Sequence, residues 1–305
     1  MRWLWSIGHF PLTRIVVGAA IVIAVPVAGA LLLDSAYKAR VGGKIPPLVL
    51  LVPILLLAHL AYVGYVWLFE RRPVCELSFS KAPAELLGGA SLGGLLAGLV
   101  VGLLAILGYD RVLGVNSLAV IVPALALAAQ SAYLEELVAR GILFRILEEW
   151  LGTWLALTIS AAIFGGLHLL NRNATVIAAL AIALSAGLLL GAAFVVTRRL
   201  WMPIGLHFAW NASLGAVLGL AVSGGEAKGL LRSELAGPEL LTGGPFGPEA
   251  SIQVMILGLV FATALLVRAK RQGRVIPPVW RRAKEAAPAE IPSDVPFESP
   301  EKEIQ

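Results

Sequence analysis

The chain is dominated by long apolar runs, separated by short polar or Gly/Pro-rich breaks. A run of about 20 apolar residues is long enough to cross the hydrocarbon core of a bilayer as a helix. The pattern predicts eight such helices, at residues 12–33, 46–69, 84–108, 117–141, 154–170, 174–197, 202–222 and 252–268. The expected fold class is therefore an all-α polytopic membrane protein with about eight transmembrane helices.

Composition supports this fold class and excludes others. The chain is 58% hydrophobic and only 14% charged, which is far too apolar for an ordinary soluble domain. Its net charge of +5 would suit a nucleic-acid-binding protein, but the basic residues lie in short loops and a tail beside apolar runs. We expect membrane lipids as partners and no nucleic acid. The single Cys75 excludes an internal disulfide and a cysteine metal cluster.

The chain divides into four parts by composition. These are the N-terminal membrane helices (1–115), a core of helices that carries the polar motifs (116–222), a Gly/Pro-rich loop with the last membrane helix (223–268) and a disordered C-terminal tail (269–305). Within the loop, residues 226–235 have weak helical potential, and the loop is either a mobile cover or a simple connection. Basic residues close to the last helix favour both termini in the cytoplasm, in what we expect to be a prokaryotic cytoplasmic membrane.

Five glycines recur in the third predicted helix. They are Gly89, Gly93, Gly94, Gly98 and Gly102. Repeated four-residue spacings place small residues on one stripe of a helix, and such stripes let two helices approach closely. We predict close packing against a neighbouring helix here.

Three charged residues interrupt the fourth predicted helix. Glu135, Glu136 and Arg140 lie within six residues of each other in an otherwise apolar run, where charges are costly and usually functional. Glu136 and Arg140 are four apart and can form an ion pair on one helix face. Glu135 lies about 140° from Arg140 around the helix, so it has no local partner. The sequence therefore predicts one structural and one chemically active glutamate.

Three later polar residues are candidates for the same site. His168 lies in the fifth predicted helix, and His207 and Asn211 share one face of the seventh. A carboxylate can take a proton from water, imidazoles can orient that water, and a carboxamide can stabilise an oxyanion, so Glu135 and these residues form a plausible hydrolytic set. The simpler interpretation is that His168 and Asn211 only join helices. Phe164 is expected to form a wall of the site.

A metal is the alternative for the same residues. Glu135, His168 and His207 are a possible zinc ligand set, since two histidines and a glutamate bind zinc in known enzymes. Neither an HExxH spacing nor a cysteine pair is present. We therefore favour activation of water without a cofactor and keep zinc as the alternative.

These residues resemble the motifs of a known family. An EExxxR pattern at Glu135 to Arg140, FxxxH at Phe164 to His168 and HxxxN at His207 to Asn211 follow one another in successive apolar helices. In this the chain resembles the CPBP family, which contains CAAX prenyl endopeptidases and the bacteriocin-processing or immunity proteins also called Abi. The resemblance covers about residues 115–222.

The resemblance implies an intramembrane endopeptidase that acts on a peptide or a lipid-modified protein. It also implies that Glu135 activates the water with His168, while His207 helps to hold it and Asn211 stabilises the oxyanion. Glu136 and Arg140 would support the site. Two other functions suit the same residues: a transporter or ion pathway, and an immunity or scaffold protein that binds without cutting. A transporter of this size often has an inverted repeat, which is not visible in this sequence.

Overall fold

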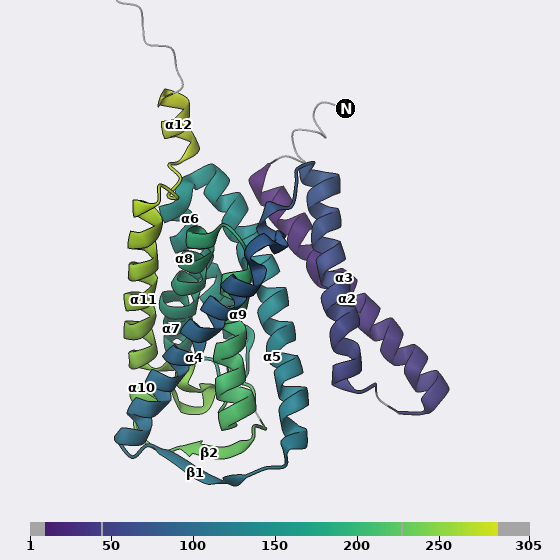
Figure 1. The fold of residues 1–305 in the computed structure, drawn as a ribbon, viewed down its shortest axis with the longest axis vertical. Helices are drawn as coiled ribbons and strands as arrows, with labels where there is room; N and C mark the ends of the chain where they lie inside the picture. Colours follow the sequence, from purple (N-terminus) through teal and green to yellow (C-terminus); the bar gives the residue numbers. More distant parts are fainter. Residues whose placement is uncertain (1–9, 44, 227, 286–305) are drawn as a thin grey trace, which may run out of the picture.

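The computed structural model describes residues 10–43, 45–226 and 228–285. Two long helices come first: α2 (Pro11–Val41) and α3 (Pro47–Tyr65), with α3 continuing as a π-helix, η1 (Val66–Glu70). They form a hairpin whose loop end diverges from the other helices (Figure 1). Both helices therefore expose much apolar surface, as expected of segments that contact lipid.

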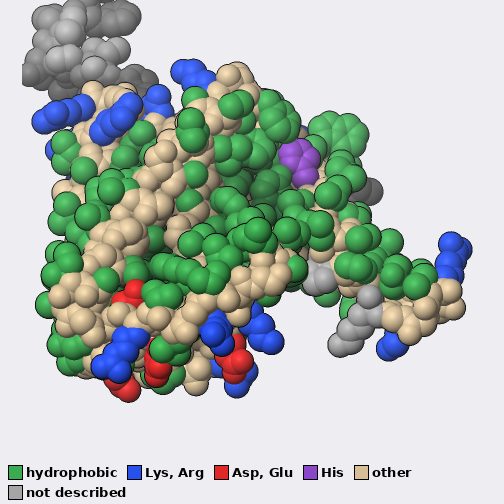
Figure 2. Space-filling model, turned by 60° about the horizontal axis from the view of Figure 1, so that its bottom comes forward, with side chains coloured by type: hydrophobic (Ala, Val, Ile, Leu, Met, Phe, Trp, Pro, Cys, Tyr) green, Lys and Arg blue, Asp and Glu red, His purple; other side chains and the backbone are tan. Residues whose placement is uncertain are grey.

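The remaining long helices form a bundle beside this hairpin (Figure 1). In chain order they are α4 (Ala82–Ile106), α5 (Ile121–Glu136) with η5 (Leu137–Phe144), α6 (Arg145–Leu167), α7 (Val176–Ile182) with η7 (Ala183–Gly187) and α8 (Leu188–Thr197), α9 (Trp201–Asn211) with η8 (Ala212–Leu218), and α11 (Ile252–Arg271). The segments η5, η7 and η8 are π-helical. Figure 2 shows hydrophobic side chains over most of the visible face, with charged ones gathered along its edges.

Short elements connect the long helices. They are η2 (Cys75–Leu77), η3 (Phe79–Lys81), β1 (Asp110–Val115), η4 (Leu118–Val120), η6 (His168–Leu170), β2 (Leu231–Leu235), α10 (Glu239–Thr242), η9 (Gly244–Phe246), η10 (Pro248–Ala250) and α12 (Val279–Glu285).

The prediction of an all-α polytopic membrane protein is confirmed. Six helical runs in the described part of the chain are long and apolar enough to cross a membrane. One of them, Leu118–Leu170, contains two predicted spans because Gly152 (φ 76°, ψ 169°) interrupts the helix between them. The predicted span 202–222 corresponds to α9 and η8, which are not among the six. The start of α2 and the end of α11 lie at the same end of the molecule, opposite the two strands (Figure 1).

The structure corrects two sequence predictions. Part of the segment with weak helical potential, 226–235, is the strand β2, which pairs antiparallel with β1. Pairing with a distant strand here overrides local propensity. The prediction of a disordered tail from residue 269 is wrong for residues 269–285, because α11 continues to Arg271 and the backbone N–H of Ile276 donates to the Thr153 hydroxyl before α12 begins. Residues 286–305, the rest of that prediction, lie outside the described residues.

Close contact between α4 and α9 sets the position of the site. A Cβ on Gly89 would overlap the Met202 carbonyl, and one on Gly93 would overlap the Leu206 carbonyl. The predicted close packing is therefore present at these two glycines, while Gly94, Gly98 and Gly102 have open space beside them. Because α9 carries His207 and Asn211, these glycines hold both side chains against the bundle.

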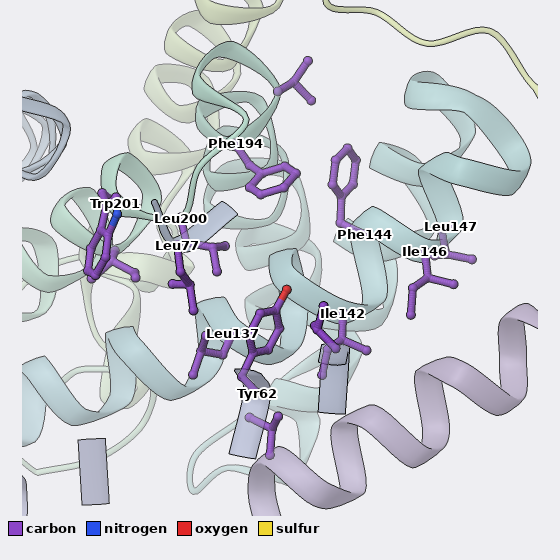
Figure 3. Close-up of a cluster of buried hydrophobic side chains, with 14 of the residues drawn as sticks. Tyr62, Leu77, Leu137, Ile142, Phe144, Ile146, Leu147, Phe194, Leu200 and Trp201 are labelled. Atoms are coloured by element: carbon purple, nitrogen blue, oxygen red, sulfur yellow. The ribbon is translucent and has the colours of Figure 1, made fainter. Parts of the chain in front are cut away.

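A buried apolar cluster lies beside the charged motif. It gathers side chains from α3, η5, α6, α8 and α9, including Tyr62, Leu137, Phe144, Phe194 and Leu200 (Figure 3). The Phe144 and Phe194 rings meet edge to face, with centroids 5.6 Å apart. The π-helical segment η5 is thus embedded in a packed core and presents its charged side chains from a rigid base.

Candidate active site

The two adjacent glutamates have different surroundings. Glu136, at the end of α5, is fully buried, whereas the Glu135 side chain is 39% exposed. Arg140 lies in η5, where the helix widens to π geometry, a feature frequent at functional sites. Its Nη1 donates to Glu136 Oε1 at 2.8 Å, so the predicted ion pair is present. Arg140 Nη2 also donates to the carbonyls of Ala186 and Gly187, which joins η5 to η7.

His207 connects the two glutamates. Its Nδ1 lies 2.9 Å from Glu136 Oε1, and its Nε2 lies 3.9 Å from Glu135 Oε2. A carboxylate paired with an arginine can only accept hydrogen bonds, so Nδ1 is the protonated nitrogen in this contact. In the neutral ring, Nε2 then carries a lone pair directed to the side of Glu135. The hydrogen bond between Glu136 and His207 was not foreseen, because it joins α5 to α9.

Phe164 links the arginine to the second histidine. The Arg140 guanidinium lies 4.4 Å from the centroid of the Phe164 ring, and the His168 ring centroid lies 4.9 Å from the same ring. Phe164 is thus a cation–π partner as well as a wall. His168 Nδ1 bonds the Phe164 carbonyl at 2.8 Å. Since a carbonyl only accepts, Nδ1 is the donor and Nε2 is the acceptor nitrogen of the neutral ring.

Asn211 is anchored to α5 by a residue that the sequence analysis did not single out. Its Nδ2 donates to the Ser131 hydroxyl at 3.1 Å, one helical turn before Glu135. The carboxamide has two N–H donors, and this bond uses one of them. A serine four residues before a glutamate in an apolar helix is a weak signal that could have indicated Ser131. Two hydrogen bonds, from His207 and from Asn211, therefore align α9 with α5.

Beside these residues lies a mainly apolar cavity. Its lining includes Phe164, His168, His207 and Trp210, with aliphatic side chains from α4, η7 and α8. His168 and His207, from helices far apart in the sequence, thus face one space. Glu249 also lines this cavity. It lies in the Gly/Pro-rich segment outside every apolar run, so hydrophobic patterning gave no signal for it.

The predicted zinc ligands do not come together in the structure. In the described ranges, no three His, Cys, Asp or Glu side chains are grouped as they would be around a metal ion. Glu135, His168 and His207 therefore do not fit the zinc set considered from the sequence.

Comparison with known proteins finds a family model that matches the segment carrying this site. A family model described as "Type II CAAX prenyl endopeptidase Rce1-like" matches residues 116–213, the segment that contains all three motifs. No curated protein and no solved structure matches the chain. Over residues 116–213, the chain is therefore similar to the CPBP/CAAX proteases.

Proposed function

We propose that the protein is an intramembrane endopeptidase in which Glu135 activates water for attack on a peptide bond. The family supports a CAAX-type intramembrane protease with a protein substrate in the membrane. The observation that carries the proposal is the unequal state of the two glutamates: Glu136 is buried between Arg140 and His207, while Glu135 is partly exposed and 3.9 Å from His207.

The water would lie between Glu135 and His207. Their 3.9 Å separation is too long for a direct hydrogen bond and suits one bridging water. Both groups are acceptors on this side, so the water would donate one hydrogen to the carboxylate and one to Nε2. Its oxygen lone pair would then face the substrate. As the oxygen attacks the carbonyl carbon, Glu135 takes the proton and later delivers it to the leaving amine.

His168 and Asn211 would act on the other side of the substrate. With Nδ1 donating to Phe164, His168 offers Nε2 to a water or to the substrate N–H from the cavity wall. The remaining N–H of Asn211 is the donor for the oxyanion of the tetrahedral intermediate. Glu136 and Arg140 support the site without proton transfer, since both are occupied by fixed partners.

The substrate would be a peptide segment, unmodified or carrying a lipid. The cavity beside the two histidines has mainly aliphatic walls, which favour an apolar group next to the cleaved bond.

The test is proteolysis by the purified protein in detergent, on a panel of prenylated and unmodified peptides. Glu135→Gln keeps the size of the side chain but cannot take a proton, so cleavage should fall at least 100-fold, on the order of a lost general base. Glu226→Gln, which removes an 87% exposed carboxylate in the loop, is the matched control and should cleave normally. Unchanged cleavage by Glu135→Gln would overturn the mechanism. Cleavage that a chelator stops and added zinc restores would favour a metal enzyme instead.

We also propose that both termini face the cytoplasm of a prokaryotic cell. Cys75 is exposed and lies beside Glu76. Glu76 belongs to a set of ion pairs that also includes Arg14, near the start of α2. Cys75 therefore lies at the same end of the bundle as the start of α2. A membrane-impermeant maleimide should label Cys75 in inverted vesicles and leave it unlabelled in intact cells. Labelling in intact cells alone would reverse the orientation.

A further inference from the structure

Glu249 is a buried carboxylate held by neutral donors. It lies in η10 just before α11, is 8% exposed and lines the cavity with His168 and His207. Its Oε1 accepts from Trp210 Nε1 at 2.8 Å. Its Oε2 accepts from the Ser223 backbone N–H at 2.6 Å and the Ser223 hydroxyl at 2.8 Å. Within the described residues, no Lys, Arg or His forms an ion pair with it, so its position depends on these three hydrogen bonds.

The turn at Ser223 and Gly224, to which Glu249 is hydrogen-bonded, is held by further close contacts. Ser223 adopts a left-handed conformation (φ 49°), which is unusual for a residue with a side chain. The next residue, Gly224, donates its N–H to the Phe246 carbonyl at 2.9 Å, and a Cβ there would overlap the Arg172 carbonyl. Asn171 Nδ2 donates to the Ser223 carbonyl at 3.1 Å. The turn at Ser223 is thus fastened to η10 on one side and to the turn after His168 on the other.

Trp210 connects this turn to His207 and Asn211, two residues of the proposed site. It lies on α9 between His207 and Asn211, lines the cavity and is 8% exposed. The indole N–H is its only donor, so the bond to Glu249 is what fixes the rotation of the ring against the cavity. A carboxylate suits this position because each of its two oxygens can accept from a different segment.

We propose that Glu249 is a positioning residue for this cavity. It fixes the Trp210 ring as the cavity wall beside His207 and Asn211, and it fastens the Ser223 turn over the end of the cavity. Glu249 acts through these two neighbours and not on the reacting atoms. The inference rests on the proposed function, since the cavity is where we place the substrate group next to the cleaved bond.

The first measurement separates positioning from chemistry by its effect on KM and kcat. A Gln at position 249 presents an N–H group where one of the two acceptor oxygens stood, so Glu249→Gln should raise KM roughly tenfold, the effect of one lost buried hydrogen bond, and lower kcat less than threefold. Trp210→Phe keeps a ring but removes the N–H, and should have a similar effect. The KM of the double variant should exceed that of the more impaired single variant by no more than about twofold, because both changes remove the same contact. Glu226→Gln is the control and should match the wild type.

The second measurement needs no enzymatic activity. Ser185 lines the same cavity and is 3% exposed. In a Cys75→Ser background, Ser185→Cys should react slowly with a water-soluble maleimide. Adding Glu249→Gln should speed this labelling at least fivefold, since the end of the cavity is then no longer fastened, whereas adding Glu226→Gln should not. Thermal unfolding of each variant verifies that it is folded.

The two measurements distinguish the possible failures. Faster labelling together with raised KM supports the proposal. Unchanged labelling in a folded Glu249→Gln variant overturns it, and so does a kcat loss as large as that of Glu135→Gln with KM unchanged. If the wild type cleaves no peptide, the proposed function fails, but the labelling rates still decide whether Glu249 closes the cavity.

Discussion

Two groups of charged residues in this protein differ in how many cationic partners each acid has. The first, which we call the charged network, lies where α2, η1, η2 and α6 meet and consists of Arg14, Glu70, Arg72, Glu76, Arg145 and Glu149. The second is the motif layer of Glu135, Glu136, Arg140 and His207. In the charged network, Glu70 alone pairs with three arginines, at 2.7 to 2.8 Å.

The motif layer has fewer cations for its acids. Glu136 pairs with Arg140 and His207, and among the described residues Glu135 has only His207 within ion-pair distance. Acids surrounded by arginines are fixed by charge-assisted hydrogen bonds, which makes them poorly suited to proton transfer. Glu135, with His207 as its one ion-pair neighbour among the described residues, is the acid to which our proposal assigns the proton transfer. The two groups thus differ in the number of fixed partners per acid, and this number separates the acids that we propose as structural from the one that we propose as reactive.

The charged network also braces the motif layer. Tyr62, on α3, donates to Glu76 and lies 3.0 Å from the Gly141 carbonyl, to which Arg145 Nε also donates at 2.8 Å. Gly141 is the residue after Arg140, and a Cβ there would lie within 3.0 Å of the Tyr62 ring, so only glycine fits. Figure 3 shows the Tyr62 side chain among the core residues of η5. The N-terminal helices therefore support the motif from outside the segment that matches the family.

Arg72, in the connection between two spans, is held in its charged form by the acids of the charged network. Burial lowers its pKa, but hydrogen bonds to Glu76 and the charges of Glu76 and Glu70 outweigh this and raise the pKa of Arg72 above its ordinary value. The raised pKa keeps the Arg72 guanidinium charged at neutral pH.

The largest expected effect comes from breaking the buried ion pair of Glu136 with Arg140 in the motif layer. Glu136→Leu leaves Arg140 buried without its carboxylate, which should cost about 3–5 kcal/mol of unfolding free energy. Unfolding in mixed detergent micelles measures this. Glu136→Leu combined with Arg140→Met should recover most of the stability without restoring cleavage. A fully stable single variant would contradict the assignment of this pair as structural.

A smaller effect is expected from the charged network. Glu70→Gln removes one charge-assisted acceptor from three arginines and should cost about 1.5–3 kcal/mol of unfolding free energy. Its kcat should stay within about twofold of the wild type, because the proposed mechanism gives the charged network no part in proton transfer. Peptide cleavage and detergent unfolding of the same preparation test both points. Loss of cleavage as complete as in Glu135→Gln would show that the two groups are not separate.

The smallest effect is expected at the link between them. Tyr62→Phe removes a hydroxyl that donates to Glu76 and lies 3.0 Å from the Gly141 carbonyl, and it should cost about 1 kcal/mol of unfolding free energy. Because Gly141 adjoins Arg140, we expect a two- to fivefold loss of kcat/KM, of the size that about 1 kcal/mol can produce. Tyr65→Phe removes a hydroxyl that donates to the Arg14 backbone carbonyl at 2.8 Å and lies 3.3 Å from Glu70 Oε1; it is the matched control and should leave kcat/KM unchanged. Equal effects of Tyr62→Phe and Tyr65→Phe on kcat/KM would show that Tyr62 does not connect the charged network to the motif layer.

The features that the sequence determined by itself are local in the chain. Apolar runs predicted the spans, the spacing of Glu136 and Arg140 predicted their pair, and the spacing of His207 and Asn211 predicted one face of α9. These follow from helix periodicity, which acts over a few residues. The difference between Glu135 and Glu136 was visible for the same reason.

Only the tertiary structure decided how distant segments meet. The contacts of Glu136 with His207, of Ser131 with Asn211 and of Glu249 with Trp210 each join two separate helices or loops. The strand at 231–235 and the ordered residues 269–285 likewise depend on distant partners, in β1 and at Thr153. A hydrogen bond between segments forms only when packing brings a donor to an acceptor, and no local periodicity encodes that distance.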